Sequence, residues 1–391
     1  MEKRHIAVLF IGNIYQIRGE FTAIHNRVKE LQKDKELVVD VYVFGEYFDN
    51  ITRRIRRGKQ KDIKSVFEFD GLVYNCLWYK YSLLDSITHK LFKRRTNIEI
   101  KNIKKHAEVF KKYDLIYAHS LYTAYIGYEL KQKYKIPFIC MWHGSSIHTL
   151  PFKDKNVLRR TMRILENADM NLFVSDELFE TAKKITTNFK GKISYNGIDT
   201  NKFRHYNDAE RELFRKEKDI AQNEKCVAFV GNCIPVKNVQ YLPTLFNHIS
   251  RQVEKIKFFI LGNGNFTELF AESGLDITYA NNVNNVEMPK WYNCMDLIVM
   301  PSINEGLPMT CLEATACGTP FVGSRVGAIA DVVGIENTVE HNDDFNESFA
   351  SLCVQRLNET TNKTILPERF VLANVVTKEK IIFNTIITHK Q

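Results

Sequence analysis

Two glutamates in a loop-to-helix pattern are the strongest candidates for binding chemistry in this sequence. Glu305 and Glu313 are separated by seven residues within the stretch 301–320. The apolar run 297–300 predicts a strand just before this stretch, and a helix is expected to begin near Leu307. Glu305 should therefore lie in the loop at the start of the helix, and Glu313 about two turns into it.

This loop combines two kinds of hydrogen-bonding group. Backbone N–H groups around residues 306–310 lie at the positive end of the expected helix and attract anions, for which a pyrophosphate is well suited. Carboxylates beside such a loop repel phosphate but accept hydrogen bonds from the hydroxyls of a sugar or a ribose. The combination predicts a nucleotide-sugar site, whereas one glutamate alone would more often be an ordinary solvated residue.

The scaffold for these residues is an alternation of short β-branched or aromatic runs with amphipathic segments. Residues 21–33 are one expected helix, with Ile24, Val28 and Leu31 at helical spacing. This alternation predicts an α/β fold with parallel sheets covered by helices on both faces. The expected strands are 5–11, 38–44, 115–118, 137–142, 171–175, 192–195, 226–231, 257–261, 276–279, 297–300 and 320–323.

The pattern restarts after the turn signal Asn196-Gly197-Ile198-Asp199, and 391 residues are enough for two α/β domains. We expect an N-terminal domain over residues 1–198 and a C-terminal domain over residues 199–375. Residues 376–391 are expected to form a helix that packs back on the N-terminal domain. Two such sheets would face each other across a cleft, with ligands at the carboxyl ends of their strands.

The net charge of +9 is concentrated in the first third of the chain. Seven Lys and Arg lie between residues 53 and 64, and nine more lie between residues 90 and 112. Two interpretations stay open: a solvated helix face, and a surface that meets anionic lipid at a membrane. Nucleic acid is not expected as a partner, because the sequence has no helix-turn-helix, RNP-type strand or zinc-finger pattern.

The composition is that of a folded globular protein, with 44% hydrophobic residues, 26 Phe and 17 Tyr. The apolar run 6–11 is too short for a signal peptide, and no apolar segment approaches the length of a membrane span. We therefore expect a cytoplasmic protein, with peripheral contact to the inner face of the cell membrane if the basic surface meets lipid. The eight scattered cysteines indicate reduced core thiols, and no pattern suggests a metal or a cofactor.

The stretch 301–331 closely resembles the E-x7-E signature of the family-four (group 1) retaining glycosyltransferases, which have the GT-B fold of two Rossmann-like α/β/α domains facing across a cleft. Residues 259–264 resemble the strand–GxG turn of this family, and residues 196–199 with Phe203 resemble its interdomain element. Within this family, the sequence is similar to glycosyltransferases that make capsule, exopolysaccharide or teichuronic acid. The positions that match the signature are Pro301, Ser302, Glu305, Gly306, Pro308, Glu313, Ala314, Ala316, Gly318, Pro320, Ser324 and Gly327.

The resemblance implies an acceptor-binding domain over residues 1–198, a nucleotide-sugar-binding domain over residues 199–375, and a set of donor-binding residues. Glu313 would bind the ribose and Glu305 the hydroxyls of the transferred sugar, with the other donor contacts from the loop residues Gly306, Leu307 and Pro308. The stretch 230–238 resembles the family's phosphate loop: Gly231, Asn232 and Lys237 would lie at the diphosphate. Lys237 would neutralise the charge of the leaving group.

Two positions of the phosphate loop depart from the family pattern. Asn232 stands where the family has an arginine, so one expected cation is missing, and Arg325 is a candidate to replace it. Asn238 stands in place of a glycine, which is a mild change because Asn tolerates left-handed conformations.

On the acceptor side, the resemblance implies roles for two histidines and a glycine. His119 would be catalytic, near the reacting sugar or the β-phosphate, and His143 and Gly19 would lie on the acceptor side. By itself, each histidine could equally be a structural residue.

The implied reaction is metal-independent transfer of a hexosyl group, with retention, to a saccharide or polyprenyl-linked acceptor in cell-surface polysaccharide synthesis. A UDP-sugar is the first choice of donor and GDP-mannose the second. A covalent intermediate and front-face attack both stay open as routes to retention.

Three other interpretations remain. The first is another GT-B enzyme, a sugar-nucleotide epimerase or a phosphorylase. The second is a Rossmann dehydrogenase. Gly262 and Gly264 argue against it, because no third glycine follows them at the spacing of the dinucleotide-binding motif. The third is a non-enzymatic nucleotide- or sugar-binding scaffold, for which Asn232 is the one hint.

Overall fold

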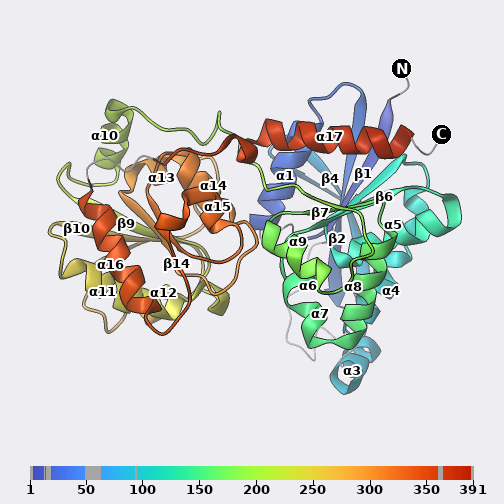
Figure 1. The fold of residues 1–391 in the computed structure, drawn as a ribbon, viewed down its shortest axis with the longest axis horizontal. Coiled ribbons are helices and arrows are strands. Elements are labelled where there is room, and N and C mark those ends of the chain that lie inside the picture. Colours follow the sequence, from blue (N-terminus) through green and yellow to red (C-terminus); the bar gives the residue numbers. More distant parts are fainter. Residues whose placement is uncertain are drawn as a thin grey trace. The chain divides into compact units, whose positions relative to one another are not determined.

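The computed structural model describes residues 3–12, 14, 19–48, 63–92, 95–359 and 364–388. The chain forms two compact units, one made of residues 1–195 together with 375–391 and the other of residues 196–374. Each unit has its own sheet and its own helices (Figure 1).

The sheet of the first unit has the strand order β3-β4-β2-β1-β5-β6-β7-β8. Its neighbouring strands are parallel except for β3 and β4, which form an antiparallel hairpin at one edge. Along the parallel strands the order reverses between β1 and β5, and ligands of open α/β sheets bind outside the carboxyl ends of the strands at such a point. The strands are β1 (Arg4–Ile11), β2 (Leu37–Phe48), β3 (Val66–Phe69), β4 (Leu72–Tyr81), β5 (Leu115–Ala118), β6 (Phe138–Trp142), β7 (Met170–Phe173) and β8 (Gly191–Ile193).

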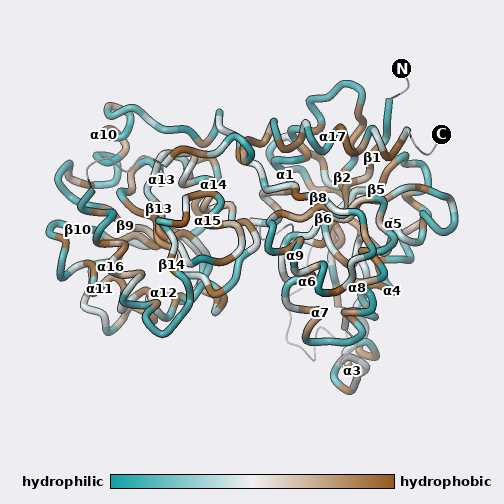
Figure 2. Tube along the Cα trace, in the orientation of Figure 1, coloured by the Kyte–Doolittle hydropathy of each residue, from teal (hydrophilic) through white to brown (hydrophobic). Residues whose placement is uncertain are grey.

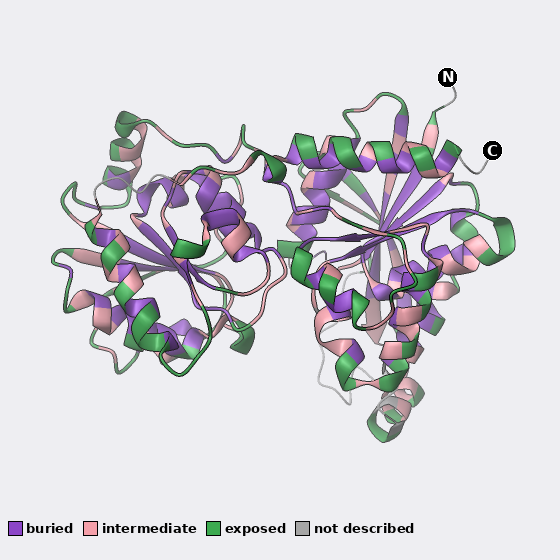
Figure 3. Ribbon diagram, in the orientation of Figure 1, coloured by how far each residue is buried: buried purple, intermediate pink, exposed green. Residues whose placement is uncertain are grey.

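Helices cover this sheet, and the C-terminal helix α17 lies alongside α1 (Figure 1). The central strands β5 and β6 are buried over their whole length, because a parallel strand covered on both faces has no solvent side (Figure 3). The helices are α1 (Gly19–Leu31), α3 (Leu83–Phe92), α4 (Arg95–Lys104), η1 (Ala107–Phe110), α5 (Leu121–Tyr134), α6 (Ser145–His148), α7 (Leu150–Lys153), α8 (Lys155–Asn167), α9 (Asp176–Lys183) and α17 (Leu372–Thr388).

The sheet of the second unit has the order β11-β10-β9-β12-β13-β14, and all its described pairs are parallel. This is the strand order of a Rossmann sheet, with its switch point between β9 and β12. The strands are β9 (Lys225–Val230), β10 (Ile256–Leu261), β11 (Ile277–Ala280), β12 (Leu297–Met300), β13 (Phe321–Ser324) and β14 (Thr338–Val339). The helices are α10 (Asp208–Glu217), η2 (Pro235–Lys237), η3 (Val239–Tyr241), α11 (Leu242–Ser250), α12 (Phe266–Leu269), α13 (Met288–Cys294), α14 (Met309–Ala316), α15 (Ile329–Val333), η4 (Ile335–Asn337), α16 (Phe345–Asn358) and η5 (Glu368–Phe370).

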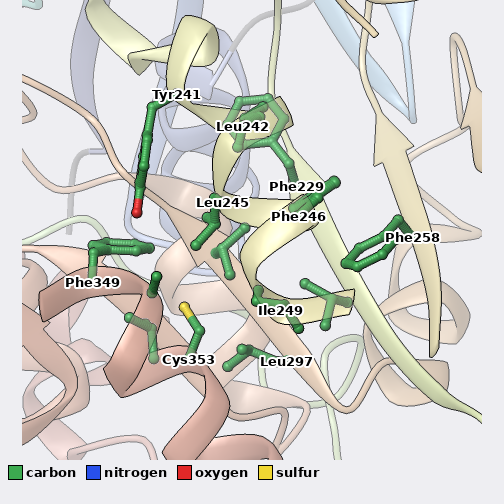
Figure 4. Close-up of a cluster of buried hydrophobic side chains, with 14 of the residues drawn as sticks. Phe229, Tyr241, Leu242, Leu245, Phe246, Ile249, Phe258, Leu297, Phe349 and Cys353 are labelled. Carbon is green, nitrogen blue, oxygen red and sulfur yellow. The ribbon is translucent and has the colours of Figure 1, made fainter. Parts of the chain in front are cut away.

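An aromatic-rich core fixes the two strands at this switch point. The ring of Phe246 in α11 stacks on Phe258 of β10 with centroids 4.5 Å apart, and Tyr241 packs edge-on against Phe349 of α16. Figure 4 shows these side chains gathered with Leu297 of β12. The hydropathy colouring in Figure 2 shows hydrophobic stretches along the strands of both units. Burial of this apolar surface holds the carboxyl ends of β9 and β12 side by side.

The predicted strands all occur; the bounds of β5 and β12 are the predicted ones, and no end of the others is shifted by more than four residues. The prediction of purely parallel sheets is wrong at one edge, where β3 and β4 pair in an antiparallel hairpin. No strand was predicted for the residues that form this hairpin. Strand β14 was also not predicted; with two residues it is too short to give a pattern. The helix predicted over residues 21–33 is α1, which begins and ends two residues earlier.

Each of the eight cysteines is free, and all but Cys233 are buried. Within the described residues, no helix has both the length and the apolar character needed to cross a bilayer. Most of the first basic run, residues 53–61, and Lys93 and Arg94 of the second lie outside the described residues.

Candidate functional site

The loop after β12 leads directly into helix α14. Pro308 is the N-cap residue in an extended conformation, so α14 begins at Met309 and not near Leu307 as predicted. Glu305 lies in the loop and Glu313 in the helix. The N–H groups of Met309 and Thr310 have no intrahelical acceptor and lie at the positive end of the helix dipole, whereas the N–H of Cys311 donates to the carbonyl of Pro308 at 3.1 Å.

The phosphate-loop lysine meets this loop. Lys237 Nζ donates to Glu305 Oε1 at 2.6 Å, and the two side chains are 18% and 13% exposed. The backbone N–H of Ile303 donates to the carbonyl of Val236 at 2.8 Å, which joins the loop after β12 to the η2 turn after β9. The structure therefore brings two of the predicted donor-binding residues into contact at the switch point of the second unit.

Two glycine turns lie against each other behind Lys237. A Cβ on Gly262 would come within 1.8 Å of the carbonyl oxygen of Gly231, so only glycine fits there. The side-chain oxygen of Asn232 accepts from the N–H of Asn263 at 3.3 Å. Asn232 thus braces the turn after β10 through an acceptor oxygen, which an arginine side chain lacks. Asn238 has the left-handed conformation (φ 51°) that the sequence led us to expect it to tolerate.

A third glycine holds the Glu305 loop from the other side. Gly327 has φ +57°, and a Cβ on it would lie 2.2 Å from the carbonyl oxygen of Gly306. The N–H of Ala328 donates to that same oxygen at 2.8 Å. Leu307 is buried, and its carbonyl accepts from Asn196 Nδ2 at 2.9 Å. The signature loop is therefore fixed by hydrogen bonds to the carbonyls of Gly306 and Leu307.

Glu313 is buried and partnered by a tyrosine. Its Oε2 accepts from the hydroxyl of Tyr292 in α13 at 2.7 Å. Burial raises the pKa of Glu313, while the hydrogen bond from Tyr292 and the charge of Lys202 oppose the rise. The second carboxylate of the signature is thus oriented by Tyr292, and the described contacts do not join it to Glu305 or Lys237.

Tyr292 is the functional candidate to which the sequence assigned no role. It lies 21 residues before Glu313, in another helix, and no local spacing rule connects the two. The available signal was the resemblance of Trp291, Tyr292 and Asp296 to the segment that precedes the signature strand in the family. Arg325, considered as a replacement cation, instead donates to Thr338 Oγ1 at 3.3 Å and pairs with Glu340, so these contacts hold it at β14.

The first unit brings its two predicted histidines together. His119, just after β5, and His143, just after β6, have Nδ1 and Nε2 2.9 Å apart, with stacked rings. Burial lowers the pKa of His119 well below its ordinary value, and burial with the charge of Arg27 lowers the pKa of His143 to about 3. Both are therefore neutral imidazoles near pH 7, and one donates to the other.

The third residue predicted on the acceptor side, Gly19, is the exposed first residue of α1. A Cβ at this position would meet no described atom within 4 Å, so the described residues leave room for a side chain there. Among those residues, no group of three or more His, Cys, Asp or Glu side chains is arranged to hold a metal ion.

Sequence comparison matches both halves of the chain to glycosyltransferase families. Residues 210–360 match the family described as Glycosyl transferases group 1, and residues 72–202 match Glycosyltransferase Family 4. An uncharacterized glycosyltransferase of Methanocaldococcus jannaschii is 28% identical over 57% of this chain and 60% of its own length. TuaC of Bacillus subtilis, named as a candidate teichuronic acid biosynthesis glycosyltransferase, is 25% identical over 56% of this chain and 55% of its own length. The chain thus spans less than two thirds of these relatives.

Solved structures share the fold over almost the whole chain. Sucrose-phosphate synthase from Thermosynechococcus elongatus superposes with a TM-score of 0.79 at 15% identity, covering 99% of this chain and 100% of the other. Anabaena HepE in complex with UDP-glucose gives a TM-score of 0.68 at 15% identity, covering 99% and 98%. The two family matches show that the chain belongs to the group 1 glycosyltransferases, and the likeness to the solved structures shows the GT-B fold of two Rossmann-like domains.

Proposed function

We propose that this protein transfers a hexosyl group from a nucleotide-sugar to a saccharide or lipid-linked saccharide acceptor, without a metal ion and with retention of anomeric configuration. The observation that carries the proposal is the contact between Lys237 and Glu305 at the switch point of the second unit, beside the start of α14. A cation, a carboxylate and helix N–H groups at one place match the diphosphate and the hydroxyls of a nucleotide-sugar.

Each part of the donor has a proposed partner. Two further N–H bonds of the Lys237 ammonium remain for diphosphate oxygens, beside the first N–H groups of α14. Glu305, oriented by Lys237, accepts from hydroxyls of the transferred sugar. Glu313, oriented by Tyr292, accepts from the ribose hydroxyls.

In the reaction, the bond between the anomeric carbon and the β-phosphate oxygen breaks, and a bond to the acceptor hydroxyl oxygen forms. The hydroxyl proton passes to the departing diphosphate, whose negative charge grows as its bond to the anomeric carbon breaks. A fixed ammonium group next to that charge stabilises the transition state more than the ground state. Lys237 is therefore the proposed catalytic cation, and His119 is proposed to hydrogen-bond the reacting sugar.

A UDP-sugar is the proposed donor, with GDP-mannose as the second choice. The complex of Anabaena HepE with UDP-glucose supports UDP as the first nucleotide to test. Thermal unfolding with a panel of nucleotide-sugars tests the choice, because a ligand at 100 times its Kd adds about 2.7 kcal/mol to stability. Transfer of radiolabelled sugar from the stabilising donor to a lipid extract then tests the activity. If no nucleotide-sugar binds at millimolar concentration, the proposal fails.

We further propose a role in cell-surface polysaccharide synthesis, with the first unit in contact with anionic lipid on the inner face of the cell membrane. Helix α3 supports this contact, since Leu84, Ile87 and Leu91 share one helix face and are 71%, 46% and 68% exposed. The adjacent Lys90 and Lys101 are also exposed and would attract acidic headgroups. The teichuronic acid name of TuaC is consistent with such an acceptor.

Flotation with phosphatidylglycerol vesicles tests this surface. The wild type should float with the vesicles, and Leu84→Ser/Leu91→Ser should not, whereas Leu213→Ser in α10 (56% exposed) should behave as wild type. A wild-type protein that stays at the bottom of the gradient contradicts the membrane contact.

Acceptor dependence separates this proposal from the other candidates. A sugar-nucleotide epimerase would consume the donor with no acceptor, and a phosphorylase would require inorganic phosphate. A scaffold would bind the nucleotide without turnover in any acceptor mixture.

A further inference from the structure

A buried ion pair joins the C-terminal helix to the body of the first unit. The guanidinium Nε of Arg27 in α1 lies 3.0 and 3.1 Å from the two carboxylate oxygens of Glu379 in α17. The side chains are 1% and 0% exposed. Arg27 Nη2 also donates to the carbonyl of Tyr195 at 2.9 Å, and the hydroxyl of Ser194 donates to Glu379. Burying two charges is unfavourable unless they are paired as closely as these are.

This ion pair lies beside the two histidines of the candidate site. The ring of Tyr117 in β5 connects them: its centroid is 4.3 Å from that of His119 on one side and 5.1 Å from that of Phe383 in α17 on the other. The charges of Arg27 and Glu379 both act on the Tyr117 hydroxyl, and the charge of Arg27 also acts on His119 and His143. The contact chain therefore runs from α17 through Tyr117 to His119.

Two polar atoms of this cluster lack a hydrogen-bond partner among the described protein atoms, Arg27 Nη1 and His119 Nε2, whereas the Tyr117 hydroxyl interacts with Glu379. Buried polar atoms are almost always hydrogen-bonded, so a fold that only needed stability would not collect two such atoms at one place. Replacing a buried ion pair by apolar residues often leaves stability unchanged or higher, so stability alone does not explain this pair either.

We propose that Arg27 and Glu379 are positioning residues for the His119–His143 pair, so that helix α17 completes the acceptor side of the site. The pair holds Tyr117 beside His119 and keeps a positive charge next to the histidines; this charge adds to the effect of burial, which is the larger cause, in keeping both imidazoles neutral. His119 Nε2, which has no protein partner, is the atom proposed to bond a sugar hydroxyl. This inference rests on the proposed function for the role of His119. The titratable and charged groups around His119 are Arg27 from α1, Tyr117 from β5, Cys140 and His143 from β6 and the residues after it, and Glu379 from α17.

The test variant is Arg27→Met/Glu379→Leu, which removes both charges and keeps similar volumes. Its matched control is Asp34→Asn/Lys380→Met, which removes the 3.0 Å ion pair that also ties α17 to this unit but contributes nothing to the environment of the histidines. We expect the test variant to lose on the order of tenfold in kcat with an unchanged donor KM, and the control to keep wild-type values. A test variant with wild-type kcat overturns the positioning role.

A readout that does not need turnover is the titration of the two imidazoles, followed by NMR on the full chain with 13C-labelled histidine and assigned with His119→Gln and His143→Gln. In the wild type both should stay neutral well below the ordinary histidine pKa of about 6.5, and in the test variant they should protonate at higher pH. Arg27→Lys, which keeps the charge, should titrate as wild type.

A wild-type pair that protonates near pH 6.5 overturns the inference even if the double variant does not fold. Nucleotide-sugar binding separates the two proposals. If the wild type binds no donor, the proposed function fails, while the histidine titration still decides whether Arg27 and Glu379 control the pair.

Discussion

Lys237 Nζ and Glu305 Oε1 lie 2.6 Å apart although the two residues are 68 positions apart in the chain. The loops after β9 and β12 create this contact, because parallel neighbours in a Rossmann sheet end at the same edge. One side chain is thus the counter-ion of the other. In the proposed function, the ammonium would orient the carboxylate toward sugar hydroxyls, and the carboxylate would hold the ammonium where a diphosphate would lie.

Replacing Lys237 by alanine should lower transfer by on the order of 10²-fold or more, chiefly in kcat, since the leaving diphosphate loses its cation. Initial rates over a range of donor concentrations measure the effect. Lys257→Ala is the matched control: it removes a lysine of the same unit that pairs with Glu224 at 3.2 Å. A Lys237→Ala enzyme that turns over like the wild type with the correct donor and acceptor would exclude this site.

Donor affinity should depend on pH through Glu313. A carboxylate accepts hydrogen bonds from ribose hydroxyls better than a carboxylic acid, so affinity should weaken as the pH falls through the raised pKa of Glu313. Tyr292→Phe removes the hydrogen bond that opposes this rise, so the loss of affinity should begin at higher pH than in the wild type. Calorimetric titration of the nucleotide from pH 5 to pH 8 measures both.

Glu313→Gln separates binding from stability. A raised folded-state pKa means that stability is present at low pH and lost as the pH rises through that value, because the buried carboxylate ionises. The amide cannot ionise, so Glu313→Gln should lose nucleotide affinity and its pH dependence without a lower free energy of unfolding at pH 8.

The control for Tyr292→Phe is Tyr279→Phe, which removes the hydroxyl of a tyrosine on β11 of the same unit. An unchanged pH dependence in Tyr292→Phe would show that Glu313 does not contact the ligand.

The sequence predicts the parallel strands well because their hydrophobic runs are short, continuous and bounded by turn residues. Residues 115–118 and 297–300 are predicted with the bounds that β5 and β12 have in the structure. The hairpin β3–β4 escapes prediction for a physical reason. Val66 and Val73 are apolar but point to solvent at the sheet edge, so the usual relation between apolar pattern and burial fails there.

For the site, local motifs identify residues but do not give their partners. Glu305 and Lys237 each stand out in the sequence, yet their ion pair depends on the strand order β9–β12. The partner of Glu313, Tyr292, and the buried pair of Arg27 with Glu379 join separate helices. Arg27 and Glu379 are 352 positions apart in the chain, and no periodic pattern in a sequence connects residues at such a separation.

Gly262→Ala should disrupt the phosphate loop without touching a charged residue. The new Cβ would lie 1.8 Å from the Gly231 carbonyl oxygen, so the backbone at Gly231 must move. We expect nucleotide affinity to fall on the order of tenfold or more, measured by calorimetry. Gly274→Asn is the control: this glycine has φ +68° with nothing within 4 Å, and Asn tolerates that conformation. Wild-type affinity in Gly262→Ala would mean that the Gly231 turn does not contact the donor.

In the second unit, two arginines that pair with one aspartate test how burial affects the contribution of an ion pair to the free energy of unfolding. Arg215 is 5% exposed, lies 3.3 Å from Asp296, and donates to the carbonyls of Cys294 and Ala221. Arg211 lies 2.7 Å from the same aspartate but is 36% exposed. Arg215→Met should lower the free energy of unfolding by about 3 kcal/mol, because four acceptors, the Asp296 carboxylate and the carbonyls of Cys294, Ala221 and Glu224, lose this donor inside the protein. Arg211→Met should lower it by less than about 1 kcal/mol, since water replaces a half-exposed guanidinium. Urea unfolding followed by tryptophan fluorescence compares the two, and equal losses would show that distance to Asp296, and not burial, controls the contribution.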